Sequence, residues 1–284
     1  MDTRNPSVSP PGDTQKQQAC SWDHTSHERF YDYYAKASQS AEAVQRFRSI
    51  QDCVLRIWVE EGKDGEQPLE VADIGCGAGA QSMIWAERGH HVHGLDVNEP
   101  LLQLARERAR QAGFTIDFQV GSAVKLPWAD GSMDICLLLE LLEHVAEWQA
   151  CLNEAARILR PGGILFLTTS NKLCPVQQEF TLPAYSWYPA PLKRYYERLA
   201  VTTRPELVNF ARYPAVNWFS FYSLRKVLAA QGFRALDRFD VMDLSTKGAL
   251  AKLIVLTVRA VSVLRCCAHV ATPGTMVVAI KGNR

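Results

Sequence analysis

The stretch of sequence that decides the fold is VADIGCGAG at residues 71–79, together with HGLDV at residues 93–97. The apolar run before Gly75 is typical of a buried strand, and the glycines that follow allow a sharp turn into a helix. The second stretch indicates another strand, which ends on the carboxylate of Asp96. A carboxylate in this position can accept hydrogen bonds from both hydroxyls of a ribose. The pattern therefore predicts a site for a cofactor that contains a nucleoside.

Two cofactor classes are compatible with these glycines. Gly75, Gly77 and Ala80 fit the relaxed fingerprint of enzymes that bind a nicotinamide or flavin dinucleotide. Asp73 argues against that interpretation, because its charge would lie close to the pyrophosphate and repel it. The same charge would attract an ammonium group. A cofactor that carries an ammonium group is therefore favoured over a dinucleotide.

Strands and helices alternate through the centre of the chain. Hydrophobic patterning predicts strands at 69–74, 91–96, 115–120, 133–139 and 163–170, and helices at 79–89, 99–112 and 147–160. This alternation predicts an α/β fold with a mostly parallel sheet and helices on both faces. Ligands bind beyond the carboxyl ends of such strands, and Asp73, Asp96 and Leu139 all fall at predicted strand ends.

With these motifs, the chain resembles the class I S-adenosylmethionine-dependent methyltransferases, and among them the ubiquinone-biosynthesis O-methyltransferase group. The matching residues are 73–79, 94–96, 142–145, 160–163 and 169–171. The resemblance implies a Rossmann-like, doubly wound sheet of about seven strands. It also implies S-adenosylmethionine as the cofactor, with these binding residues: Asp73, Gly75, Gly77, Gly79, Asp96, Val97, Ser122, Ala123 and Leu139. Many relatives have an acidic residue in place of Ser122, which leaves the predicted contact with adenine open.

A group of polar residues follows the strand predicted at 133–139. A phenol is mostly protonated at neutral pH, so an O-methyltransferase benefits from a base or a metal ion. His144 is the candidate catalytic base, and Glu140, Glu143 and His144 together could bind a divalent metal. Related metal sites usually add a later histidine, and only His269 follows here. The alternative interpretation is that Glu143 and His144 cap and orient a loop.

Aromatic side chains are concentrated after the predicted core. Twelve of the 27 aromatic residues lie between Phe180 and Tyr222, with basic residues interleaved among them. A segment inserted at this point of the fold would stand over the mouth of the active site. We therefore predict that residues 171–222 form an aromatic-rich substrate cap. The alternative is a packing subdomain whose aromatic rings bury one another.

The remaining segments complete the predicted organisation of the chain. Residues 1–20 are expected to be a disordered tail, 21–68 to form N-terminal helices and 69–170 to form the cofactor-binding core. Residues 223–284 are expected to supply the rest of the core, with strands at 233–241 and 276–281. Between these strands, residues 249–270 predict one amphipathic helix with a basic face. Such a helix can lie on a membrane, although a stripe of this kind often packs on a core.

Charge and cysteine content limit the classes of function that the sequence is compatible with. The net charge of +1 gives no overall attraction to nucleic acid, and the eight cysteines show no metal-binding or disulfide-framework spacing. The first residues contain no apolar run, so we expect a cytoplasmic protein, with peripheral membrane contact as the alternative. The leading hypothesis is methylation, mainly at oxygen, of an apolar or aromatic small molecule. The alternatives are an RNA methyltransferase and a non-catalytic methyltransferase-like scaffold. The sequence gives no indication of the oligomeric state.

Overall fold

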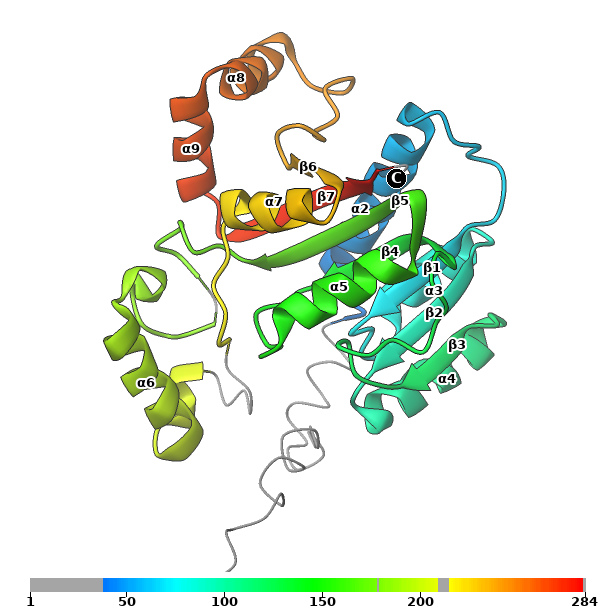
Figure 1. The fold of residues 1–284 in the computed structure, drawn as a ribbon, viewed down its shortest axis with the longest axis horizontal. Coiled ribbons are helices and arrows are strands. Elements are labelled where there is room, and N and C mark those ends of the chain that lie inside the picture. The colour runs from blue at the N-terminus through cyan, green and yellow to red at the C-terminus, as the bar shows by residue number, and fades with distance from the viewer. Residues whose placement is uncertain (1–37, 178, 209–214, 283–284) are drawn as a thin grey trace, which may run out of the picture.

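The computed structural model describes residues 38–177, 179–208 and 215–282. Its strands are β1 (Glu70–Ile74), β2 (His91–Asp96), β3 (Asp117–Val120), β4 (Met133–Leu139), β5 (Leu159–Ser170), β6 (Phe233–Asp237) and β7 (Gly274–Lys281). They form one seven-stranded sheet in the order β3-β2-β1-β4-β5-β7-β6 (Figure 1). β7 is antiparallel to both of its neighbours, whereas the pairs from β3 to β5 are parallel. The predicted mostly parallel, Rossmann-like sheet is confirmed.

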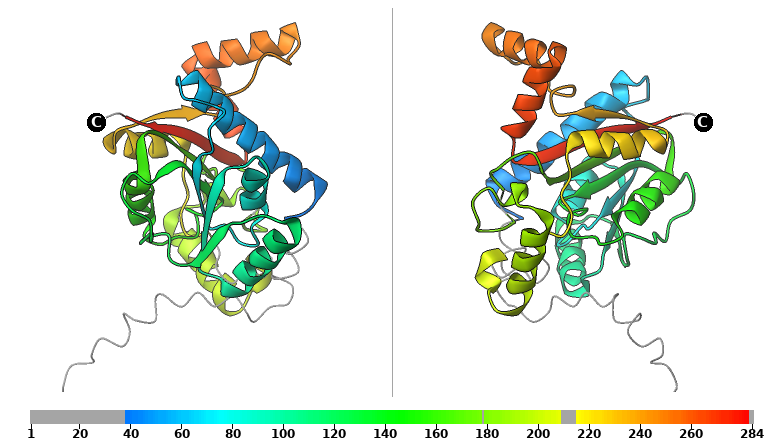
Figure 2. Two further views of the ribbon diagram at one scale, coloured as in Figure 1. Left: turned by 90° about the vertical axis from the view of Figure 1, so that its right-hand side faces the viewer. Right: turned by 60° about the vertical axis from the view of Figure 1, so that its left-hand side comes forward.

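Helices cover both faces of this sheet (Figures 1 and 2). The helices are α2 (Ala41–Glu60), α3 (Ala80–Glu87), α4 (Glu99–Ala112), α5 (Trp148–Ile158), α6 (Ala190–Thr202), α7 (Phe221–Ala230), α8 (Ala249–Ala260) and α9 (Ser262–Val270). Alternate side chains of β4 enter two separate cores. Ile135 and Leu137 pack with residues of α2 and α3, whereas Cys136 and Leu138 pack with residues of α5 and α7. Because β4 is buried on both faces from Ile135 to Leu138, the five residues from Ile135 to Leu139 are all apolar instead of alternating with polar residues.

Some predicted boundaries need correction. The strand predicted at 163–170 already begins at Leu159, because Leu159 pairs with Met133 of β4. The strand predicted at 233–241 ends at Asp237, whose carboxylate accepts hydrogen bonds from the backbone N–H groups of Phe239 (2.8 Å) and Asp240 (3.0 Å). These bonds close a turn and end the pairing with β7.

The single helix predicted at 249–270 is wrong. The backbone is extended at Val261, and α8 and α9 meet there at an angle of 108°. Arg259 and Arg265 lie on either side of this break, and both bind residues of the loop after β6. On a straight helix these two side chains would lie about 120° apart, at opposite margins of the predicted basic face, and the bend brings both to that loop. In the described residues no helix alone has the length and apolarity to cross a membrane, and only the bent α8–α9 pair passes that test jointly.

The segment between β5 and α7 forms a small unit beside the sheet (Figure 2). It contains α6 and two short 3₁₀ helices, Tyr185–Trp187 and Pro205–Val208. Its own apolar core includes Phe180 and Tyr185, whose rings are stacked at 3.9 Å. Some of its aromatic rings therefore bury one another, while its role as a substrate cap stays a prediction. Outside the described residues lie 1–37, including the predicted disordered tail, and residues 209–214 of the cap.

Candidate functional site

The glycine turn after β1 depends on backbone geometry that only glycine adopts readily. Gly75 has φ +77° and Gly79 has φ +76°, both in the left-handed region. A Cβ atom added at Gly79 would lie 2.9 Å from Ala105 Cβ and from Phe118 Cζ. The N–H groups of Gly75 and Cys76 donate to the Leu95 carbonyl at 2.7 and 3.1 Å. The turn is therefore fixed to the end of β2.

Asp96 closes β2 next to this turn. One carboxylate oxygen accepts a hydrogen bond from the N–H of Gly77 (2.9 Å) and the other from the N–H of Asn98 (2.8 Å). Burial raises the pKa of Asp96, and the backbone hydrogen bonds oppose that rise. Each oxygen keeps further acceptor capacity, so the carboxylate can still receive hydroxyl donors from a ribose.

Asp73 lies in the interior at the end of β1, with only 2% of its surface exposed. The Ser82 hydroxyl donates to its carboxylate at 2.6 Å. Burial, with a smaller contribution from the Asp96 charge, raises the pKa of Asp73 to about 6. Within the described residues, no lysine or arginine forms a salt bridge with Asp73 or Asp96. Two unneutralised carboxyl groups therefore make this edge of the sheet a favourable place for a cation.

The structure brings the other predicted cofactor residues to the same edge. The N–H of Gly121 donates to the Asp96 carbonyl at 3.0 Å, which places Ser122 and Ala123 beside the end of β2. Val97 follows Asp96 directly, and Leu139 is the last residue of β4, beside β1. All nine predicted residues thus lie at the carboxyl ends of β1, β2, β3 and β4 or in the loops that follow. Their contacts with a cofactor stay predictions.

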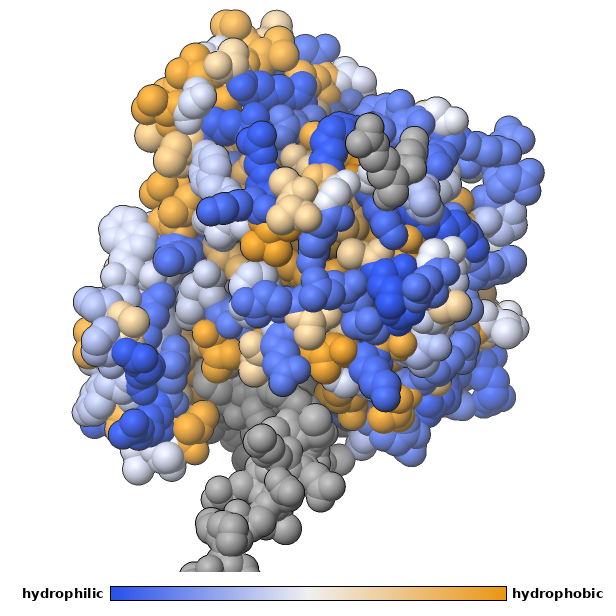
Figure 3. Space-filling view, in the orientation of Figure 1, coloured by the Kyte–Doolittle hydropathy of each residue, from blue (hydrophilic) through white to orange (hydrophobic). Residues whose placement is uncertain are grey.

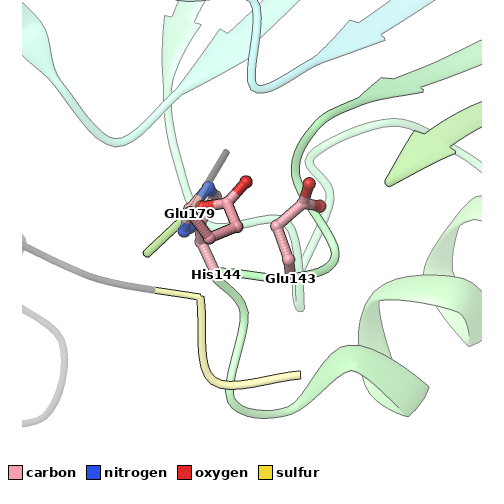
Figure 4. Close-up of side chains that lie close together, drawn as sticks. All are labelled: Glu143, His144 and Glu179. Carbon is pink, nitrogen blue, oxygen red and sulfur yellow. The ribbon is translucent and has the colours of Figure 1, made fainter. Parts of the chain in front are cut away.

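A second polar group lies after β4 and joins the core to the cap. The potential ligand atoms of Glu143, His144 and Glu179 lie within 4.8 Å of one another (Figure 4). Glu143 is fully buried and accepts a hydrogen bond from the Thr169 hydroxyl at 2.9 Å. The Ser170 hydroxyl donates to Glu179 at 2.9 Å. Burial, and then the negative charges of Glu140 and Glu179, raise the pKa of Glu143.

This group differs from the one predicted from sequence. Glu179 takes part and Glu140 does not, because Glu140 is exposed and its backbone turns at φ +49°. His269 is committed elsewhere, since its ring bonds Asp237 at 2.8 Å and stacks on Phe221 at 5.4 Å. Among the described residues, Nδ1 of His144 is buried and has no hydrogen-bond partner. No sequence signal indicated Glu179, because it reaches the group through the fold of the cap.

A cavity of about 640 Å³ lies in the cap beside this group. Its lining includes Lys172, Trp187, Tyr188, Lys193, Val216 and Trp218. The Lys193 ammonium lies 4.5 Å from the centre of the Trp218 ring and donates to the Ser186 carbonyl. The N–H of Val216 donates to the Glu143 carbonyl at 2.9 Å, which joins the cavity wall to the loop after β4. One wall of this largely aromatic and cationic pocket is therefore hydrogen-bonded to the loop that carries Glu143 and His144, although neither of these side chains lines it.

Known proteins match both the sequence and the fold. The methyltransferase domain family matches residues 72–167. The ubiquinone biosynthesis O-methyltransferase of Sinorhizobium fredii is 31% identical over 208 residues, which cover 70% of this chain and 76% of that protein.

Solved structures share the fold at lower sequence identity. A protein of Pyrococcus horikoshii OT3 is similar with a TM-score of 0.55 at 16% identity, over 90% of this chain and 99% of that one. The magnesium protoporphyrin IX methyltransferase of Synechocystis, solved with bound SAH, has a TM-score of 0.52 at 17% identity. The match covers 90% of this chain and 95% of that one. These structures show the shared fold. The sequence match to the relative from Sinorhizobium fredii, with the glycine turn and Asp96, shows that the chain belongs to the class I S-adenosylmethionine-dependent methyltransferases.

Proposed function

We propose that this methyltransferase transfers its methyl group to an oxygen atom of an apolar or aromatic small molecule. The observation that carries the proposal is the aromatic pocket in the cap, whose wall at Val216 is hydrogen-bonded to the loop after β4 that carries Glu143 and His144. The relative from Sinorhizobium fredii, a ubiquinone biosynthesis O-methyltransferase, gives further support for oxygen as the acceptor atom. Trp187, Tyr188 and Trp218 offer flat apolar surface to a ring-shaped acceptor.

In this proposal the cofactor is held at the carboxyl edge of the sheet. Asp73 and the turn from Gly75 to Gly79 receive its methionine end, and Asp96 receives the ribose hydroxyls. Ser122 and Ala123 lie beside the adenine, and Leu139 lines the cofactor at the end of β4. The buried carboxyl group of Asp73 and the partly buried one of Asp96 fit the positive charge of S-adenosylmethionine, which supplies a methyl group already activated on sulfur. The protein contributes mainly the relative orientation of cofactor and acceptor.

His144 is the proposed base for the acceptor hydroxyl. Its Nδ1 has no partner among the described residues, so it is free to accept a proton from a substrate oxygen. We expect His144→Gln to lower kcat strongly and to leave S-adenosylmethionine binding unchanged, as measured by calorimetry. A His144→Gln enzyme with the wild-type kcat at every pH would rule out this role.

The same group also fits a divalent metal ion as a second cofactor. Two carboxylates and an imidazole are suitable donors, and the raised pKa of Glu143 reflects a buried carboxyl group that no cation neutralises. Glu143, His144 and Glu179 would hold the ion, which would polarise the acceptor oxygen. We expect chelation to lower activity and added Mg²⁺ to restore it, with Glu179→Gln requiring more Mg²⁺. Full activity after exhaustive chelation would contradict the metal proposal and leave the base role of His144 in place.

The acceptor class can be tested with S-adenosylmethionine that carries a labelled methyl group. The purified protein is incubated with this cofactor and with fractionated extract from its source. An Asp96→Asn variant, which we expect to bind the cofactor more weakly, serves as the control at a low cofactor concentration. We expect label in the small molecules that extract into organic solvent, with mass spectrometry identifying the methylated atom. Label in RNA or protein would contradict the proposal and favour a macromolecular substrate.

A further inference from the structure

Helices α8 and α9 expose an unusual amount of aliphatic surface. α8 has no buried side chain, although its sequence is largely apolar. Leu250 is 72% exposed and Val263 is 71% exposed. The exposed aliphatic residues, which we name the α8–α9 apolar surface, are Leu250, Leu253, Ile254, Leu256, Val261, Val263 and Leu264. Figure 3 shows hydrophobic residues gathered over these two helices, and Figure 2 shows the helices projecting away from the sheet.

The polar side chains of the two helices hold this surface outward. Arg259 donates to three carbonyl groups in the loop after β6, at 2.7 to 3.2 Å. Arg265 pairs with Asp237 at 2.7 Å and also with Asp240, and His269 bonds Asp237 at 2.8 Å. Burial alone would raise the pKa of Asp237. The hydrogen bonds from His269 and Arg265 outweigh that effect and hold the pKa well below the usual range. Arg259, Arg265 and His269 of the basic face thus bind the rest of the protein, and the apolar face is left without a partner in the described residues.

The charges around the surface favour an anionic partner. Residues 244–284 contain no aspartate or glutamate. Lys247 and Lys252 form no salt bridge within the described part of the chain. Besides the hydrogen bonds from Ser245, the nearby charge of Lys247 helps to lower the pKa of the Asp243 carboxyl group, so Lys252 is the lysine whose charge is left for an external partner. Lysines next to an apolar helix face are attracted to the headgroups of anionic lipids.

The aliphatic composition favours lipid over a protein partner. Residues 244–284 contain no phenylalanine, tyrosine or tryptophan, whereas the cores of protein interfaces are enriched in aromatic residues. The α8 helix has 12 residues and a length of about 18 Å, too short to span a hydrocarbon layer of about 30 Å. The bend of 108° also prevents the pair from forming one straight span. The geometry fits helices that lie in the plane of a membrane interface.

We propose that the α8–α9 apolar surface docks this protein onto a membrane that contains anionic lipids. The aliphatic side chains enter the boundary between headgroups and acyl chains, and Lys252 contacts the anionic headgroups. Arg259 and Arg265 fix the helices to the loop after β6, so docking leaves the sheet unchanged. The inference concerns attachment to a lipid surface and does not rest on the acceptor proposed above.

The test is co-sedimentation of the full chain with phosphatidylcholine vesicles that contain or lack phosphatidylglycerol. The docking variant is Leu250→Gln/Leu253→Gln/Ile254→Gln. The matched control is Val59→Gln/Val120→Gln/Val176→Gln, which removes three exposed aliphatic side chains elsewhere. We expect the wild type and the control to sediment with anionic vesicles, and the docking variant to bind at least roughly tenfold more weakly. We also expect Lys252→Glu to weaken binding, because it reverses that charge.

Three results would overturn the proposal. The wild type could stay in the supernatant with both vesicle types, or the docking variant could sediment as fully as the wild type. The third is self-association: a chain that is dimeric without vesicles, becomes monomeric in the docking variant and binds no vesicles would assign the surface to a second copy. Thermal unfolding and calorimetric binding of S-adenosylmethionine show that each variant is folded. Vesicle binding is measured without an acceptor, so its outcome is separate from that of the proposed reaction.

Discussion

The carboxyl edge of the sheet buries polar side chains that are usually exposed, whereas the α8–α9 apolar surface exposes aliphatic side chains that are usually buried. At the sheet edge, Asp73 and Glu143 are buried carboxyl groups without a salt-bridge partner among the described residues. On α8, leucines such as Leu250 and Leu253 are more than half exposed. Each arrangement costs free energy in the isolated chain, and each becomes favourable when a ligand or surface of matching chemistry is present. The comparison indicates two places where the protein is suited to an external partner: a ligand at the sheet edge and an apolar surface at α8 and α9.

The largest effect is expected from the backbone that shapes the sheet edge. Gly79→Ala places a Cβ atom 2.9 Å from two neighbours at a positive φ, so we expect a loss of about 3 kcal/mol in the free energy of unfolding. The matched control is Gly89→Ala, which has φ +83° but no neighbouring atom within 4 Å. Because the control keeps only the backbone strain, we expect it to lose about 1 kcal/mol. Equal losses in urea titrations would show that close packing at Gly79 is unimportant.

The next effect concerns the ribose contact. Asp96→Asn removes the charge and keeps the shape, so we expect S-adenosylmethionine to bind on the order of 100-fold more weakly, about 2.7 kcal/mol. Titration calorimetry measures this change directly. Asp117→Asn on β3 is a suitable control, because Asp117 is an exposed carboxylate outside the proposed site. Unchanged affinity in Asp96→Asn would remove Asp96 from the proposed site.

A smaller effect should appear in the pH dependence of cofactor binding. Burial raises the pKa of Asp73 to about 6, and a bound cation favours the ionised carboxylate, so binding releases a proton below that pH. We therefore expect affinity for S-adenosylmethionine to rise with pH and to be about tenfold weaker at pH 5 than at pH 7. Asp73→Asn should bind more weakly and lose this dependence. A wild-type affinity that stays constant over the range would contradict the assignment of Asp73 to the methionine end.

The smallest effect is expected on the α8–α9 apolar surface without vesicles. Leu253 is 62% exposed, so Leu253→Ala should change the free energy of unfolding by no more than about 0.5 kcal/mol. Leu138 is fully buried in β4, and Leu138→Ala should cost about 3 kcal/mol. Chemical denaturation of the two variants compares the same side-chain change inside and outside the core. A loss above 2 kcal/mol for Leu253→Ala would mean that α8 packs against the protein.

Local signals predicted part of the fold well. α4 was predicted at 99–112 and found there, because Asn98 caps its first turn and Gly113 ends it at φ +77°. β4 was predicted at 133–139 and also found there, since an apolar run such as the one from Ile135 to Leu139 is typical of a central parallel strand. Asp73, Asp96 and Leu139 reach one edge because parallel strands end together.

Long-range packing explains what the sequence did not predict. Glu179 joins Glu143 and His144 only because the cap folds back toward the loop after β4. The bend at Val261 has no proline or glycine to indicate it, and depends on contacts between Arg259 and the loop after β6. The inward direction of the basic side chains likewise follows from the position of Asp237, which a helical pattern alone does not contain.

The position of α8 and α9 along the chain has an evolutionary consequence. Both helices lie within the connection of one antiparallel pair, because β6 and β7 are adjacent in the sheet. The entropy of closing such a connection changes by only about 0.6 kcal/mol for each doubling of its length. A lineage could therefore shorten or exchange this module with little effect on the sheet, provided that Asp237 also changed, since it would lose Arg265 and His269. The proposed attachment to a membrane and the methyl-transfer reaction could then evolve separately.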